Sequence, residues 1–504
     1  MTQAGPARLF WAFMAFLTCL RLAVAAVTPI SPDEAYYWVW SKHLALSYFD
    51  HPPMVAYWIR AGTAVFGDAE FGVRWLAPLA CFVSTMALVD ATKILTGDLR
   101  ASLMTGLLFN ATLMAGIGSV VTTPDTPLLM FWCLTIWTIS KVSTTGNGNW
   151  WLAIGVFAGL ALLSKYTATL LGLGILCWLV AAKDQRHWFA DWHLWAGGAI
   201  ASILFVPVLV WNADHGWISF VKQGGRLGTG GTGTTSRNIG ELVAGQIGLA
   251  TPLLFMLIVA GAFVAVHRAW RDRQGSPVLL AALFIPAAGL FFVQAFFDRV
   301  QGDWPAILYP AAVVTAAAFS PQWAKAWQWP SAAFGIAIAL TLYTQTAFAV
   351  FPIPPKADMT LRRMAGWSAF AADIVTQARA VGASAVTSED YGVASILAFE
   401  LPSDVSLIAI GPRWQYFDVP VIDSASLAGK AALLIIDRRS DHSTAAFASL
   451  TPVTDVNRTR AGKTAETYHL FRAEEWTGRE IGVRLSLAPQ DTPPTANLFS
   501  SVKR

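Results

Sequence analysis

Long apolar runs recur along most of this chain and constrain its fold more than any other feature. A helix needs about 20 predominantly apolar residues to cross the hydrocarbon core of a bilayer. Eleven runs approach that length, near residues 9–27, 72–95, 99–118, 126–142, 149–164, 166–182, 193–212, 241–266, 277–297, 304–320 and 331–350. Because many similar runs follow the first, we interpret it as an uncleaved span rather than a signal peptide. The sequence therefore predicts a polytopic α-helical membrane protein with about eleven transmembrane helices.

The composition supports this class. Of the 504 residues, 55% are hydrophobic and only 13% are charged, whereas about 25% charged residues is usual in a soluble domain. The net charge of +4 is too small to argue for nucleic-acid binding. All four cysteines lie inside apolar runs, where a thiol behaves as a small hydrophobe. Their positions indicate neither a disulfide framework nor a metal cluster.

Basic residues in the connections predict the orientation. Eleven spans put the two chain ends on opposite sides of the membrane. With the N-terminus inside, the mostly short cytoplasmic connections hold Arg8, Arg100, Lys141, Lys183, Arg186, Arg268, Arg271, Arg273 and Lys325. The outer connections hold fewer basic residues over longer segments. Because Lys and Arg accumulate in cytoplasmic loops, we expect a cytoplasmic N-terminus.

The stretch 31–54 is too charged to cross a bilayer and too aromatic for an ordinary solvated loop. Its start, SPDE at 31–34, combines a Ser cap, Pro at the first helical position and acidic residues near the positive end of the helix dipole. DHPP at 50–53 is expected to stop that helix, because two prolines disfavour the αR conformation before them. We predict two interfacial helices separated by a sharp turn, the second over about residues 54–66.

The composition changes near residue 351. Prolines at 352, 354 and 355 make a stiff exit from the last apolar run. Residues 360–381 look helical, and the strand-like segments SAVTSED, VSLIAI, AALLIID and TYHLFRA alternate with helical or loop segments. We expect a transmembrane catalytic domain over 1–350 and an extracytoplasmic α/β domain over 351–504, with a loose tail over 489–504.

Ionisable residues gather in the connections expected outside. TPD at 123–125 repeats the cap-Pro-Asp arrangement of the first helix start, and SKYT, FDR, GDWP and the Gly-rich loop 211–240 add further charges. Such groups at membrane depth are functional candidates. The candidate catalytic residues are Asp33 and Asp125, and the candidate substrate-binding residues are Glu34, Tyr48, Asp50, His51, Arg74, Lys165, His215, Arg226, Arg299 and Asp303.

The same residues have structural alternatives. Asp33 and Asp125 suit helix caps, each worth about 1 kcal/mol, although the repeated Pro-Asp favours function. Glu34 stands at the reciprocal position of a capping box, and Lys165 suits a snorkelling residue at a helix end. The Gly-rich run lacks the ending of a phosphate loop. No second histidine stands at ligand spacing from His215, so no metal site is predicted and a divalent metal remains open.

Several motifs in this order resemble a known family. DEAYYW, YFDHPPM, FGVRW and TTPD are followed by SKYT, WNADHGW and GDWP. They are similar to the protein mannosyltransferase-like branch of the GT-C membrane glycosyltransferases, which includes the lipid A aminoarabinose transferase and bacterial lipid A galacturonosyltransferases. The resemblance is specific over roughly residues 9–170, whereas the C-terminal domain matches only in its α/β character.

The resemblance implies an inverting glycosyltransferase at the periplasmic face of a bacterial inner membrane. Its implied partners are a polyprenyl-phosphate-linked sugar, a glycolipid acceptor of the lipid A or lipopolysaccharide type and membrane lipids. It implies that Asp33 is the catalytic base and that Asp125 is the Asp of the second outer loop. The alternative is a polytopic transporter or lipid flippase, which would place ionisable residues near mid-span or show inverted repeats.

Two departures from the family concern positive charge. Where the aminoarabinose transferases carry Glu-Lys-Pro, this chain has Asp-His-Pro at 50–52, and where they carry an Arg three residues after the first Asp, it has Tyr36. A lipid phosphate leaves as an anion, so the reaction needs one base and nearby cations. We expect Lys165, Arg226 or Arg299 to supply the missing charges.

Overall fold

The chain divides into two compact units. The first comprises Met1–Pro29 and Trp40–Pro352, and the second Ile30–Val39 and Ile353–Arg504. The division falls inside α2 (Pro32–Lys42), so the start of this helix belongs to the second unit. The sequence-based boundary at 350/351 remains a prediction. The computed structural model describes residues 4–225, 234–419, 421–422, 427, 429–437 and 445–485.

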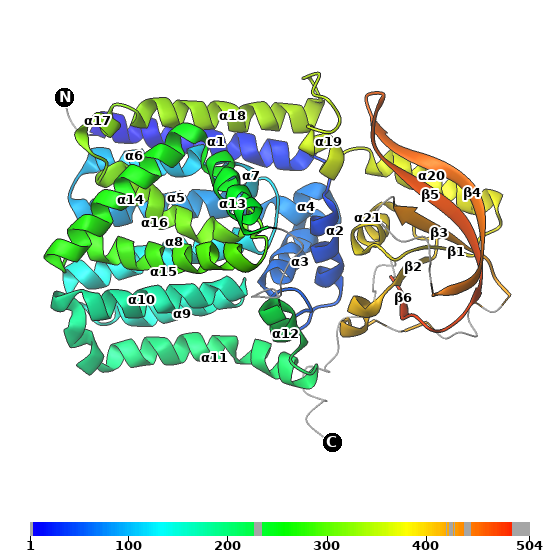
Figure 1. Ribbon diagram of the computed structural model, residues 1–504, viewed down its shortest axis with the longest axis horizontal. Helices are drawn as coiled ribbons and strands as arrows, with labels where there is room; N and C mark the ends of the chain where they lie inside the picture. The colour runs from blue at the N-terminus through cyan, green and yellow to red at the C-terminus, as the bar shows by residue number, and fades with distance from the viewer. Residues whose placement is uncertain are drawn as a thin grey trace. The chain divides into compact units, whose positions relative to one another are not determined.

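The first unit is a helical bundle (Figure 1). Its α-helices are α1 Ala4–Val27, α3 Met54–Phe66, α4 Glu70–Arg74, α5 Leu76–Thr96, α6 Leu99–Ala111, α7 Leu113–Gly118, α8 Asp125–Thr145, α9 Trp150–Leu162, α10 Thr169–Ala181, α11 Trp192–Asp214, α12 Ile218–Gly225, α13 Thr235–Ala250, α14 Pro252–Asp272, α15 Ser276–Phe297, α16 Tyr309–Ala318, α17 Gln322–Lys325 and α18 Gln328–Phe348. Its 3-10 helices are η1 Tyr166–Ala168, η2 Lys183–Ala190 and η3 Trp304–Leu308.

Among the described residues, seven helices are long and apolar enough to cross a membrane, or eight if the bent pair Tyr166–Ala181 and Lys183–Ala190 forms one span. The prediction of a polytopic α-helical membrane protein is confirmed. The number eleven remains a prediction, because several of the apolar runs fold into shorter helices such as α6 and α9, each of 13 residues. The run 241–266 is broken at Thr251 (φ 72°), so its long apolar helix begins only at Pro252.

The helix start at residues 31–34 forms as predicted. The backbone N–H and the hydroxyl of Ser31 donate to Glu34 Oε2 at 3.1 and 2.9 Å, and the Glu34 N–H donates to Ser31 Oγ at 3.3 Å. This reciprocal pattern is a capping box. Glu34 is fully buried, and its contacts are those expected of a capping residue rather than of a substrate-binding one.

The predicted end of α2 at residues 50–53 is wrong, because the helix already ends at Lys42. Tyr48 holds the following loop instead. Its hydroxyl lies 3.0 Å from the carbonyl oxygens of both Trp40 and His43, and its ring stacks on Trp40 at 4.3 Å. The second helix, α3, spans Met54–Phe66 as predicted.

The second unit contains a six-stranded mixed sheet in the order β4-β5-β3-β1-β2-β6. β1 pairs in parallel with β2 and β3, whereas β4, β5 and β6 pair antiparallel. The prediction of a C-terminal α/β domain is confirmed. The elements are α19 Met359–Met364, α20 Trp367–Ala380, β1 Ala385–Ser388, α21 Tyr391–Glu400, β2 Leu407–Ile410, η4 Pro412–Tyr416, β3 Ala432–Asp437, β4 Phe447–Arg460, β5 Lys463–Trp476 and β6 Gly482–Arg484.

The four predicted strand segments contain β1, β2, β3 and part of β5, but β4 and the three-residue β6 were missed. β4 is a largely exposed strand, so it lacks the apolar run by which the other strands were found. The predicted helix over 360–381 is two helices, separated at Gly366. This glycine has φ +80°, and a Cβ there would lie 2.3 Å from the carbonyl oxygen of Thr459.

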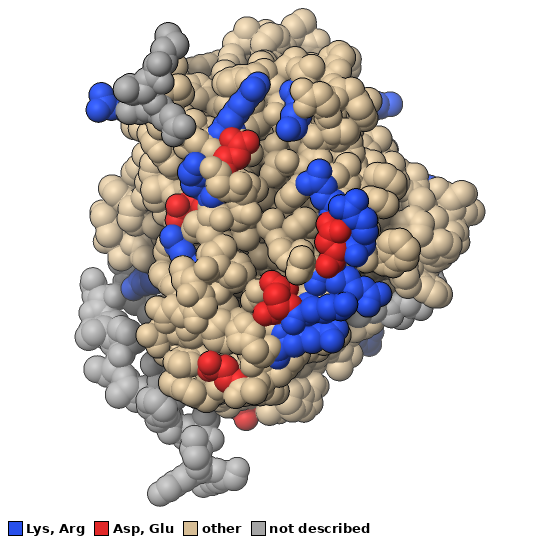
Figure 2. Space-filling model, turned by 90° about the vertical axis from the view of Figure 1, so that its left-hand side faces the viewer, with Lys and Arg blue, Asp and Glu red and all other residues tan. Residues whose placement is uncertain are grey.

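Figure 2 looks onto the end of the bundle where the chain begins, and basic side chains predominate over acidic ones on this face. Two acidic residues of the first unit are paired with basic ones. Asp90 lies 3.0 Å from Lys141 Nζ, and Asp272 accepts from Arg271 at 2.7 Å. The end therefore presents a basic surface between apolar helix flanks.

Helices α9 and α11 approach each other closely at two glycines. A Cβ on Gly197 would lie 2.3 Å from the carbonyl oxygen of Trp151, and one on Gly155 would lie 2.2 Å from the carbonyl oxygen of Gly197. Small residues at such contacts let helix backbones pack closely inside a membrane. The next residue, Gly198, has open space around its Cβ position.

We expect Gly197→Ala to destabilise the protein by about 1–3 kcal/mol, because the methyl group forces the two helices apart. The matched control is Gly198→Ala, which should be neutral or slightly stabilising because alanine favours the helix. Thermal unfolding of both variants in detergent measures the difference. Equal unfolding temperatures for the two would contradict the close packing of α9 on α11.

Candidate functional site

Three candidate residues from separate connections meet in the first unit. Lys165 stands between α9 and η1 in an extended conformation, Asp125 is the first residue of α8, and Asp303 immediately precedes η3. Lys165 Nζ lies 2.7 Å from Asp125 Oδ2 and 3.3 Å from Asp303 Oδ2. The side chains of Lys165 and Asp125 are each 7% exposed, whereas that of Asp303 is 47% exposed. We call these three residues the ion triad.

The environment of the ion triad favours the charged forms of Lys165 and Asp303. Burial alone would lower the pKa of Lys165, but the carboxylates of Asp125 and Asp303 outweigh burial and raise that pKa. Burial would raise the pKa of Asp303, but the charge and hydrogen bond of Lys165 lower it, with a smaller effect from the charge of His51. The ammonium group of Lys165 thus faces the carboxyl groups of both Asp125 and Asp303.

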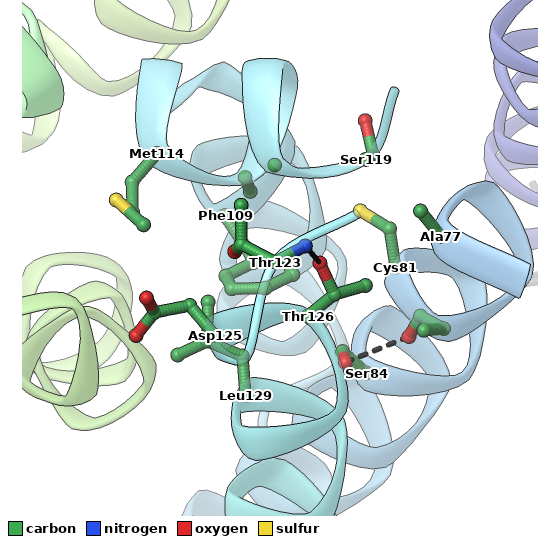
Figure 3. A pocket seen from close by; sticks show the side chains of 13 residues that line it. Ala77, Cys81, Ser84, Phe109, Met114, Ser119, Thr123, Asp125, Thr126 and Leu129 are labelled. Atoms are coloured by element: carbon green, nitrogen blue, oxygen red, sulfur yellow. Dashed lines mark hydrogen bonds between the residues drawn. The ribbon is translucent and has the colours of Figure 1, made fainter. Parts of the chain in front are cut away.

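One carboxylate oxygen of Asp125 is available to accept a further hydrogen bond. Its Oδ2 accepts from Lys165, but Oδ1 is buried and has no hydrogen-bond partner among the described residues. The residue lines a cavity of about 30 Å³ (Figure 3), where Asp125 and Met114 lie on one side and Cys81 and Ser119 on the other. This volume admits a water molecule but no sugar. Because Oδ2 accepts from Lys165 and Oδ1 has no partner in the described part of the chain, the contacts of Asp125 differ from those of a simple helix cap.

The loop at residues 48–51 lies against α12. Lys222 Nζ forms an ion pair with Asp50 and lies 3.9 Å from the centroid of the Phe49 ring. Ser219 Oγ donates to the carbonyl oxygen of Tyr48, and Gln223 Nε2 to that of Asp50, each at 2.8 Å. Lys222 was absent from the predicted binding set. The sequence offers no signal for its pairing, because its partner is 172 residues away.

Three of the predicted substrate-binding residues make contacts that stabilise the fold. Arg74 is fully buried, and its guanidinium donates to the backbone carbonyls of Thr28 and Pro29 after α1. Tyr48, also buried, holds the loop after α2. His215 stacks on Trp211 with ring centroids 4.0 Å apart, and its Nδ1 lies 2.7 Å from the Trp211 carbonyl oxygen. These contacts explain the three side chains structurally, and substrate binding by them remains a prediction.

The two arginines outside the ion triad that were predicted to bind substrate in the outer loops are Arg299 and Arg226. Arg299 is 73% exposed and lies 2.9 Å from Glu241, which also pairs with Arg237 at 2.9 Å. Glu241 was missed by the sequence analysis. Arg226 lies outside the described residues, so its predicted role remains a prediction.

Asp33 lies in the second unit. Ser31 and Glu34 form the capping box of α2, and Asp33 Oδ1 accepts from the Tyr391 hydroxyl at 3.1 Å. Asp33 and Asp125 belong to different units, so their meeting in one site remains a prediction. Within the described ranges, no group of three or more His, Cys, Asp or Glu side chains is arranged to hold a metal ion.

We expect Lys165→Met to destabilise the protein by about 3–5 kcal/mol, because it leaves a buried carboxylate without its partner. The control is Lys141→Met, which removes an ion pair whose side chains are 24% and 50% exposed and should cost at most about 1 kcal/mol. Thermal unfolding in detergent compares the two. Partial recovery in the double variant Lys165→Met/Asp125→Asn would confirm coupling, and equal losses for Lys165→Met and Lys141→Met would contradict it.

Comparison with known proteins agrees with this fold. Residues 50–211 match the family model described as dolichyl-phosphate-mannose-protein mannosyltransferase. The lipid A galacturonosyltransferase RgtD of Rhizobium johnstonii is 24% identical over 416 residues, which are 80% of this chain and 85% of that protein. An undecaprenyl phosphate-alpha-4-amino-4-deoxy-L-arabinose arabinosyl transferase of Pseudomonas aeruginosa is 27% identical over 313 residues, or 55% of this chain and 53% of that protein. The chain thus spans about half the length of this second relative.

A solved structure extends the likeness over nearly the whole chain. The crystal structure of ArnT from Cupriavidus metallidurans, bound to undecaprenyl phosphate, superposes with a TM-score of 0.63 and covers 97% of this chain and 100% of ArnT. At 16% sequence identity, this likeness shows a shared fold. The resemblance predicted from the sequence is confirmed: the chain is similar in sequence and in fold to the protein mannosyltransferase-like GT-C membrane glycosyltransferases.

Proposed function

We propose that this protein is an inverting glycosyltransferase that moves a sugar from a polyprenyl-phosphate donor to a glycolipid acceptor of the lipid A type. The relatives named above act on such molecules by their descriptions. The observation that carries the proposal within this chain is the ion triad, in which a buried carboxylate beside a cation keeps one oxygen without a partner among the described residues. A carboxylate so placed accepts a hydrogen bond from a substrate hydroxyl once the cavity, which admits only a water molecule in this structure, opens to it.

Asp33 is the proposed catalytic base. A carboxylate within hydrogen-bond reach of the acceptor hydroxyl takes up its proton as the hydroxyl attacks the anomeric carbon. The bond from that carbon to the phosphate oxygen breaks, and the polyprenyl phosphate leaves as an anion. Asp125 orients the substrate in this scheme. The capping box of α2 is formed by Ser31 and Glu34, and the half-buried Asp33 instead contacts the Tyr391 hydroxyl, which supports a chemical role.

Lys165 and His51 are the proposed cations for the departing phosphate. Asp303 is the more distant and the more exposed of the two carboxylates at Lys165. A phosphate oxygen that displaces Asp303 would keep the ammonium paired while the buried Asp125 contact stays in place. His51, whose charge acts on Asp303, stands in the same neighbourhood. Asp303 thus holds Lys165 in the absence of donor.

We propose a bacterial inner membrane as the location, with the ion triad facing the periplasm. The basic face in Figure 2, at the end of the bundle where the chain begins, suits the cytoplasmic side. The N–H of Met54, at the start of α3, donates to the carbonyl oxygen of Leu163 at 3.0 Å, so the turn carrying Lys165 adjoins the segment between the first two spans. That segment lies on the opposite side from the N-terminus.

The assay that tests the function incubates purified protein with a labelled polyprenyl-phosphate sugar and a lipid A-type acceptor, and measures sugar transfer and release of lipid phosphate. We expect Asp33→Asn to lower kcat by about 10²–10⁴-fold, since it removes the base. The matched control is Asp98→Asn, at a carboxylate that caps α6 by accepting from the Arg100 N–H at 2.8 Å. Full activity of the folded Asp33→Asn protein would refute the base assignment.

The proposed exchange at Lys165 predicts a specific kinetic effect. We expect Asp303→Asn to lower the KM for the donor about 3–10-fold, because the competing carboxylate charge is removed. Lys165→Arg, which keeps the charge but changes its geometry, should raise that KM. Steady-state kinetics over a range of donor concentrations measure both. A raised donor KM for Asp303→Asn would show that Asp303 does not compete with the phosphate.

A further inference from the structure

The second unit packs its own polar residues around the start of α2. Tyr391 is the first residue of α21, and the preceding Asp390 fixes this helix start by accepting from the Val393 N–H at 2.8 Å. A Cβ added at Gly392 would lie only 3.0 Å from the Cβ of Pro32. The beginnings of α21 and α2 therefore approach closely, and this brings the Tyr391 hydroxyl within 3.1 Å of Asp33 Oδ1.

The ring of Tyr391 is held between further side chains of the same unit. Its centroid lies 4.9 Å from that of Tyr36 at an interplanar angle of 63°. The guanidinium carbon of Arg413, in η4, lies 3.8 Å from the Tyr391 ring centroid and 5.3 Å from that of Tyr36. The neighbouring Trp414 is fully buried and lies 5.8 Å from Tyr36. The edge contact with Tyr36 and the guanidinium of Arg413 over the ring restrict the rotation of the phenol, so the direction of its hydroxyl is set before substrate binds.

We propose that Tyr391 is a positioning residue for Asp33, and that Arg413 holds Tyr391 in place. The inference rests on the proposed function, in which Asp33 is the base. A phenol that donates to one carboxylate oxygen fixes the plane of the carboxylate and favours its ionised form. A base must be ionised and correctly directed before it can accept a proton. The C-terminal domain thereby takes part in the reaction without touching substrate.

A purely structural role for Tyr391 makes a different prediction. If the hydroxyl only ties α21 to α2, its removal lowers stability and leaves the pH dependence of turnover unchanged. If it positions the base, its removal lowers kcat, leaves the donor KM nearly unchanged and moves the acidic limb of the pH–rate profile to higher pH. The limb moves in this direction because a carboxylate that loses a donor binds its proton more tightly.

The decisive variant is Tyr391→Phe in the full-length protein, because it deletes only the hydroxyl. We expect kcat to fall about 10-fold, as for a lost hydrogen bond to a charged group, with the shift of the acidic limb described above. Tyr416→Phe, in η4 of the same unit, is the matched control and should leave kcat and the pH profile unchanged. Arg413→Met should lower kcat in the same direction as Tyr391→Phe, and Arg413→Lys should lower it less.

The double variant Asp33→Asn/Tyr391→Phe separates the inference from the function. If Tyr391 acts through Asp33, the double variant is no slower than Asp33→Asn alone, because the two losses are not additive. Additive losses, or a Tyr391→Phe protein with normal kcat and normal pH profile beside an inactive Asp33→Asn protein, would overturn the inference and leave the proposed function intact. A fully active Asp33→Asn protein would overturn both the base assignment and the inference.

Discussion

The buried ion pair between Lys165 and Asp125 is the interaction on which the arrangement of the first unit depends most. Removing two charges from water is costly, and only close geometry with further polar contacts recovers that cost. Lys165 stands between α9 and η1, Asp125 begins α8, and Asp303 precedes η3. Because an unpaired charge at that depth is strongly unfavourable, the pairing restrains the three connections relative to one another.

The second unit changes the interpretation of the first polar loop. The helix start that carries Asp33 belongs to the same compact unit as the C-terminal domain. Tyr36 occupies the position at which the related aminoarabinose transferases carry an arginine, and the guanidinium of Arg413 lies over its ring. The guanidinium thus places a positive charge beside Tyr36, although the sequence around Tyr36 does not supply one at that position. The C-terminal domain, for which the sequence suggested no role, supplies this charge and the hydroxyl that contacts Asp33.

Much of the candidate site could be predicted from residue type and position, and the limits of that prediction are physical. The repeated Pro-Asp drew attention to Asp33 and Asp125, and the structure pairs Asp125 with Lys165 and Asp33 with Tyr391. Glu34, Arg74 and Tyr48 were equally good candidates by residue type and position. In the structure, however, their hydrogen bonds stabilise a helix start or nearby backbone carbonyl groups. A charged or polar side chain in a loop does not reveal whether its partner will be a carbonyl group or a substrate. Lys222, Glu241, Tyr391 and Arg413 were missed because each acts on a residue far away along the chain.

The sequence by itself determined the polytopic helical class, the capping box at residue 31, the bounds of α3 and the α/β character of the C-terminal part. These features follow from local periodicity, hydropathy and cap chemistry, which act over a few residues. Only the tertiary structure decided that α2 stops at Lys42, that Lys165 joins two carboxylates and that Tyr391 meets Asp33. Such contacts join residues 40 to 358 positions apart. They arise only when packed helices and strands bring distant segments together, and no pattern within a single segment encodes them.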